Sequence, residues 1–311
     1  MIAVLLGCPV EPDTGAATLP ATEPRLLVSG QMNLADFDAP AALELDLDGN
    51  VTWSLTPEPD AGAFGARRLD DGQTLVAWTR LPPDTAAGLV IADDDGAVSW
   101  RYDEKLGGPL TFPHGVDALG DGTVLVADTY RGDVLAIDTS GSLLWDLSVL
   151  SSRHAGAPSG MSRGVYDGKE YILVTQLDNL DGQVPNDTLT AFLVEGDEEP
   201  RELWVWPPER SPESSLWIHG PRMLDDGTVL GSMAGHGQVV RLDLEGNEIE
   251  RFPPDEHESR LAFPRDAAFL PDGRLVVLDA TEVLLVTDPG GAFEVEVLAE
   301  LSFGYSLEVV Y

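Results

Sequence analysis

The chain has 311 residues, of which 54 are acidic and 18 basic, and its formal net charge at pH 7 is -36. This charge argues against nucleic acid as a partner, because phosphate binding requires a basic patch and the sequence has none. The single cysteine, Cys8, excludes a disulfide within the chain, and no segment has the length and apolarity of a transmembrane helix.

The N-terminal residues Leu5, Leu6, Gly7 and Cys8 resemble the lipobox of bacterial lipoproteins, in which the cysteine is lipidated after the signal peptide is removed. Only seven residues precede Cys8, without a basic start, so residues 1–8 form a truncated signal or match the lipobox by chance. Residues 9–24 are rich in Pro, Thr, Ala and acids and predict a disordered tether. We expect a protein of the bacterial cell envelope, lipid-anchored through Cys8 or periplasmic, that meets a membrane only through that lipid.

One unit returns about every 45 to 60 residues over residues 25–311: a β-run, an Asp-Gly type of turn, a hydrophobic run and a second hairpin. The inner turns fall at Asp71-Gly72, Asp121-Gly122, Asp167-Gly168, Asp226-Gly227 and Asp272-Gly273. Outer turns fall at Asp48-Gly49, Asp95-Gly96, Ser140-Gly141, Glu195-Gly196, Glu245-Gly246 and Gly290-Gly291. This pattern predicts one all-β domain, a six-bladed β-propeller.

The inner turns number one fewer than the outer turns, so one inner strand is missing from the series. The C-terminal run Tyr305–Tyr311 aligns with His114–Leu119 and ends where the turn is due. We expect it to join the N-terminal blade beside residues 26–29, which closes the ring and removes two free sheet edges.

Inner strands line the central channel of a propeller, and their first residues open on the face where most ligands bind. Alignment on the inner turns places one residue of each of five blades at an equivalent position: Phe64, His114, His219, Arg265 and Tyr305. In the fourth blade Gly160 and Arg163 both fit that position. Polar groups that converge on one cavity favour a polar ligand, although each histidine also fits the role of a structural cap.

Long connections precede two inner strands, at residues 149–161 and 206–217, and long propeller loops are often functional. Trp217 ends the second connection, and we expect it to contact a ligand on this loop face. The ligand is a small molecule or a protein, and we expect a monomer.

The pattern of His114, Leu119, Asp121-Gly122, Asp128 and Trp145 resembles that of bacterial arylsulfotransferase-like propellers. The resemblance implies a six-bladed, exported protein that transfers a sulfuryl group between phenolic compounds. It implies catalytic roles for His114 and His219, with Arg265 or Arg163 on the sulfate oxygens. The net charge argues against an anionic substrate unless the site itself is locally positive.

The run from Gly115 to Thr129 also resembles the NHL repeat, one branch of which binds zinc through three histidines. This chain offers His114 and His219 with Tyr305 in place of a third, so a zinc site is incomplete. Neither Asp93–Asp95 nor residues 46–50 complete a calcium loop. We expect no cofactor, with zinc and calcium as alternatives.

Three functions therefore stay open: sulfuryl transfer to phenolic acceptors, non-catalytic binding of a ligand or protein, and a metal-dependent lyase or hydrolase.

Overall fold

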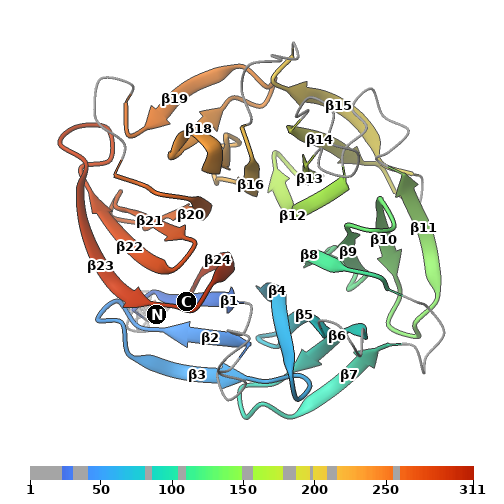
Figure 1. The fold of residues 1–311 in the computed structure, drawn as a ribbon. Helices are drawn as coiled ribbons and strands as arrows, with labels where there is room; N and C mark the ends of the chain where they lie inside the picture. Colours follow the sequence, from blue (N-terminus) through green and yellow to red (C-terminus); the bar gives the residue numbers. More distant parts are fainter. Residues whose placement is uncertain are drawn as a thin grey trace, which may run out of the picture.

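The strands form six four-stranded antiparallel sheets arranged around a central channel, as Figure 1 shows. The computed structural model describes residues 23–30, 41–80, 86–103, 110–148, 157–177, 187–196, 199–208, 216–254 and 260–311. Cys8 and residues 9–22 of the expected tether lie outside the described residues. Within the described ranges, no helix has the length and apolarity needed to cross a bilayer.

Each sheet is one blade, and its strands run outward from the channel. The first three blades are β24 (Gly304–Val310), β1 (Arg25–Gly30), β2 (Ala42–Leu45) and β3 (Val51–Leu55); β4 (Ala61–Arg68), β5 (Thr74–Arg80), β6 (Ala87–Ala92) and β7 (Val98–Tyr102); and β8 (Pro113–Ala118), β9 (Val124–Asp128), β10 (Asp133–Ile137) and β11 (Leu143–Ser148). The other three are β12 (Ala157–Tyr166), β13 (Lys169–Leu177), β14 (Thr188–Val194) and β15 (Arg201–Trp206); β16 (Ile218–Met223), β17 (Val229–Met233), β18 (Gln238–Leu242) and β19 (Glu248–Phe252); and β20 (Pro264–Phe269), β21 (Leu275–Asp279), β22 (Glu282–Thr287) and β23 (Glu294–Glu300).

Closure of the ring through the C-terminus is confirmed. Strand β24 pairs antiparallel with β1, from Arg25 opposite Val310 to Ser29 opposite Ser306. The Ser29 and Ser306 hydroxyls also share a hydrogen bond of 2.7 Å. The first blade is thus assembled from the two ends of the chain, which lie together in Figure 1.

The hydrophobic core lies between neighbouring blades. One cluster joins Leu27 and Leu55 of the first blade to Ala63, Val76 and Val90 of the second. Five further clusters repeat this arrangement around the ring. Since apolar burial is the main favourable term in folding, each blade depends on both of its neighbours.

Candidate functional site

An irregularity in each inner strand turns one side chain toward the channel. In β4, β20 and β24 the register skips Phe64, Arg265 and Tyr305 respectively. In β8 and β16 the shift begins at or beside His114 and His219. Such β-bulges leave a residue without a ladder partner and aim its side chain away from the regular pleat.

Carboxylates at the ends of the second strands hold the segments that lead into two of these inner strands. Asp128 accepts hydrogen bonds from the backbone N–H groups of Thr111 (2.7 Å) and Phe112 (2.8 Å). Asp279 does the same for Ala262 (2.8 Å) and Phe263. These bonds fix the positions of Phe112 and Phe263 at the mouth of the channel.

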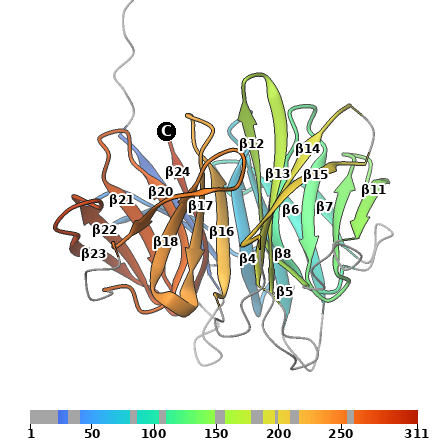
Figure 2. The same ribbon diagram turned by 90° about the horizontal axis from the view of Figure 1, so that it is seen from above.

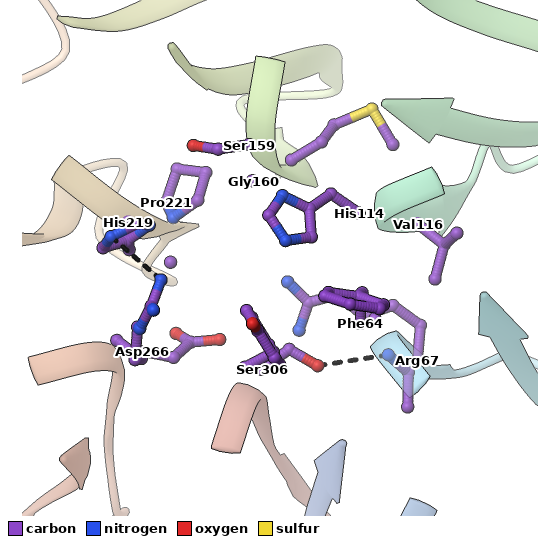
Figure 3. Close-up of a pocket in the computed structure, with 17 residues that line it drawn as sticks. Phe64, Arg67, His114, Val116, Ser159, Gly160, His219, Pro221, Asp266 and Ser306 are labelled. Atoms are coloured by element: carbon purple, nitrogen blue, oxygen red, sulfur yellow. Dashed lines mark hydrogen bonds between the residues drawn. The ribbon is translucent and has the colours of Figure 1, made fainter. Parts of the chain in front are cut away.

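All five residues predicted for the ring position line one pocket at that mouth: Phe64, His114, His219, Arg265 and Tyr305. Figure 3 shows the His114 ring reaching into the middle of the pocket, with His219 at its side. The space between the walls, counted out to the solvent, is about 430 Å³, but only about 30 Å³ admits the centre of a water molecule. The pocket is therefore narrow and suits one small polar group at a time.

The fourth blade places Ser159 at the ring position, a residue that the sequence alignment missed. In β12 the register skips Ser159 between Pro158 and Gly160, and Ser159 and Gly160 both line the pocket. Arg163, the other residue predicted for this position, lies in a second pocket toward the opposite end of the channel, where it pairs with Glu170 and with Asp70 at 3.8 Å. The alternative that Arg163 joins the ring is therefore corrected. The triplet Pro158-Ser159-Gly160 repeats Pro113-His114-Gly115, and that signal identifies the position.

Trp217 lies beside the pocket and not in its wall. Its ring packs edge-on against Phe263 at a centroid distance of 5.3 Å, and its side chain is 39% exposed. Its backbone N–H is held by Asp187 at 2.5 Å. A contact with a ligand on the loop face remains a prediction, and the lipidation of Cys8 falls outside the described residues.

Arg265 is held among aromatic rings and has no carboxylate partner among the described residues. Its guanidinium lies 4.7 Å from the ring centroid of Phe263, 4.9 Å from that of Phe303 and 5.0 Å from that of Tyr305. Its Nε is buried without a hydrogen-bond partner in the described chain. Burial lowers the pKa of Arg265 to about 10, so the group stays charged at neutral pH.

The two imidazoles beside this cation are uncharged. Burial, followed by the Arg265 charge, lowers the pKa of His114 to about 3 and also lowers the pKa of His219 well below 6.5. Arg265 Nη1 lies 3.1 Å from His219 Nε2. Because a guanidinium only donates, Nε2 accepts and the His219 proton resides on Nδ1.

Three further residues line the pocket that the sequence did not single out: Arg67, Asp266 and Ser306. Ser306 accepts a hydrogen bond from the backbone N–H of Ala66 in the second blade at 3.1 Å. Asp266 is 1% exposed and accepts one from the backbone N–H of Leu307 at 2.9 Å. Such contacts join blades far apart in the chain, so only the tertiary structure identifies them.

No group of three or more His, Cys, Asp or Glu side chains in the described ranges has the arrangement of a metal site.

A family model described as outer membrane protein assembly factor BamB matches residues 10–245. The chain belongs to this family. Among proteins of established description, none is significantly similar in sequence.

Several solved structures share the fold of this BamB-family propeller. A protein of unknown function from Bacteroides caccae has a TM-score of 0.63 at 15% identity, covering 93% of this chain and 99% of the other. The periplasmic gluconolactonase of Pseudomonas aeruginosa has a TM-score of 0.59 at 14% identity, covering 93% and 99%. Virginiamycin B lyase of Staphylococcus aureus has a TM-score of 0.56 at 14% identity, covering 89% and 84%. At such identities the likeness concerns the propeller alone, and the arylsulfotransferase-like and NHL-like resemblances stay predictions.

Proposed function

We propose that this BamB-family propeller binds a small aromatic molecule with an anionic group in the pocket at the mouth of its channel. The observation that carries the proposal is the Arg265 guanidinium, which has aromatic rings around it and no carboxylate beside it in the described residues. All other described arginines except the exposed Arg260 form ion pairs. In a chain with such an excess of acid, an uncompensated cation in a narrow pocket favours an anion from outside.

The aromatic rim supports a planar ligand body. Ring contacts run without a break from Tyr130 through Phe112 and Phe64 to Tyr305, with centroid distances of 4.7, 4.7 and 4.4 Å. Tyr130 is 64% exposed at the outer end of this series. Aromatic ligands gain from offset or edge contacts with such rings, by about 0.5 to 1.5 kcal/mol for each pair.

Sulfuryl transfer is the second candidate, and the state of His114 favours it. Both nitrogens of this neutral imidazole are buried without a hydrogen-bond partner in the described residues, so a lone pair is free for attack. In the transfer, a His114 nitrogen bonds to the sulfur of an aryl sulfate while the bond from sulfur to the phenolic oxygen breaks. The phenolate leaves with that electron pair. A second phenol then attacks the sulfur, His114 recovers its electron pair, and the proton of this phenol passes to the phenolate. Arg265 stabilises the charge on the sulfate oxygens.

One experiment with 4-nitrophenyl sulfate tests both candidates. Calorimetric titration should show binding that Arg265→Met weakens by about 10- to 100-fold, the loss expected for a hydrogen bond to a charged group. The matched control Arg163→Met, in the other pocket, should bind as the unaltered protein does, and 4-nitrophenol should bind all three alike. An unaltered protein that binds no aryl sulfate, or an Arg265→Met variant that binds it equally, contradicts the proposal.

The same mixture with a phenol acceptor tests the transfer. Release of 4-nitrophenol that disappears in His114→Ala, and persists in the variant His236→Ala on the exposed turn Ala234–His236, supports sulfuryl transfer. Binding without release reduces the function to ligand binding.

We also propose a location in the cell envelope with a lipid on Cys8. The family description, an outer membrane assembly factor, supports this location. Strand β1 begins at Arg25, opposite Val310, whereas Tyr305 and the pocket lie at the other end of β24. The C-terminus marks that distal face in Figure 2. An anchor before β1 therefore leaves the pocket facing away from the membrane.

A further inference from the structure

We infer that Arg67 forms the floor of the pocket and binds the anionic group directly, so that the site selects an aryl sulfate over an aryl carboxylate. The inference rests on the proposed function, since it names the class of ligand that the same pocket takes.

Arg67 lies on β4, three residues beyond Phe64 and deeper along the channel. Its side chain is 7% exposed and lines the pocket, where Figure 3 labels it. Its one ion pair joins Nε to Asp117 Oδ2 at 3.4 Å. Neither of its Nη atoms donates a hydrogen bond to a described residue, and neither is sealed from the pocket space.

The carboxylates near Arg67 are already occupied by backbone N–H groups. Asp117 accepts from the N–H of Arg163 at 2.7 Å, Asp266 from that of Leu307 at 2.9 Å, and Glu308 from that of Arg68 at 2.7 Å. They supply the negative charge that keeps Arg67 protonated but leave its terminal nitrogens free.

The other deep arginine is fully engaged and makes a useful contrast. Arg222 donates to the backbone oxygens of Ala267 (3.1 Å) and Leu307 and lies 3.5 Å from Asp266. It ties the fifth blade to the sixth and first. Within the described residues, Arg67 is therefore the deep guanidinium whose donors face the pocket.

The number of free donors favours a tetrahedral anion. The two Nη atoms of Arg67 and Nε of Arg265 offer more N–H groups than the two oxygens of one carboxylate accept in good geometry, whereas a sulfate ester presents three terminal oxygens. A phosphate ester has the same shape but carries nearly a second charge at neutral pH. That charge is disfavoured beside Asp117, Asp266 and Glu308 in a protein with net charge -36.

The test measures the affinities of 4-nitrophenyl sulfate, 4-nitrophenyl phosphate, 4-nitrobenzoate and 4-nitrophenol for the full chain. We expect the unaltered protein to prefer the sulfate to the benzoate and the phosphate by at least tenfold. Arg67→Met and Arg67→Lys should lose at least tenfold in sulfate affinity, while benzoate and phenol affinities stay within about twofold because Arg265 and the aromatic rim remain.

Arg163→Met is the matched control, and Arg67→Lys keeps a charge beside Asp117 if the methionine variant folds poorly. Unchanged sulfate affinity in both Arg67 variants overturns the role of Arg67 and leaves the proposed function intact. Equal affinity for sulfate and benzoate in the unaltered protein overturns the selectivity. Failure of the unaltered protein to bind any of the three anions overturns the proposed function itself.

Discussion

At the residue scale, the two pocket histidines share an environment that disfavours their charged forms. His114 is 8% exposed and His219 is 5% exposed, and both lie near the Arg265 cation. Burial removes the hydration that an imidazolium needs, and the neighbouring guanidinium adds repulsion. Two groups that titrate near neutrality in water are thereby kept neutral, and this state preserves the lone pair that the second candidate function uses.

A pH dependence of stability follows from the lowered pKa of His114. The pKa is about 3 in the folded protein against 6.5 for the model value, so the unfolded state binds more protons between these limits. The unfolding free energy therefore falls as pH decreases below 6.5, by about 1.4 kcal/mol per pH unit for one such group. We expect His114→Phe to lose less stability between pH 7 and 5 than the unaltered protein in denaturant unfolding. His236→Gln, on the exposed turn, is the control, and parallel curves for all three proteins contradict the prediction.

At the element scale, the inner strands position the site through their bulges and through the glycines that follow. A glycine comes directly after Phe64, His114, Ser159 and His219. At Gly115 a Cβ atom lies 2.4 Å from Met161 N, and at Gly220 it lies 2.5 Å from Arg265 O. Neighbouring inner strands approach each other here more closely than any side chain allows. Repeated glycines are readable in the sequence, but the approach that requires them is a property of the closed ring.

Substitution at Gly220 separates crowding from backbone strain. Gly220 has φ +51 and close contacts with Arg265 and Asp266, whereas Gly122 has φ +87 and nothing within 4 Å of a Cβ atom. Both Gly220→Ala and Gly122→Ala incur the left-handed penalty of roughly 1 to 2 kcal/mol, but only the former also displaces Arg265. We expect Gly220→Ala to lower the unfolding free energy further and to weaken aryl sulfate binding. Equal losses in the two variants, with binding intact in both, oppose this account.

At the scale of the whole molecule, β24 is the element through which ring and site depend on each other. It carries Tyr305 into the pocket, and Glu308 binds the backbone of the second blade. Leu307 donates its N–H to Asp266 of the sixth blade. One strand thus links three blades and completes a wall of the pocket.

Removal of residues 304–311 should open the ring. It exposes the edge of β1 and the core around Leu26 and Val28, and free edges and apolar surface promote association. We expect the truncated protein to form oligomers in size-exclusion chromatography and to lose its sharp thermal transition. Deletion of Tyr311 alone, which is 61% exposed, should have little effect. A monomeric truncated protein with an unchanged midpoint argues against closure as the source of stability.

The sequence by itself determined the number of blades, the closing strand and five of the six ring residues. The reason is that Asp-Gly turns recur at fixed distances from the inner strands, so alignment on the turn also aligns the side chains. That alignment failed in the fourth blade, where β12 and β13 run to Tyr166 and Lys169 around a tighter turn and hide Ser159.

Only the tertiary structure decided the chemistry of the pocket. The absence of a described carboxylate beside Arg265, the free Nη atoms of Arg67 and the uncharged state of His114 all depend on residues from other blades. Burial and charge are sums over neighbours in space, and a closed ring brings together neighbours that the order of residues along the chain does not reveal.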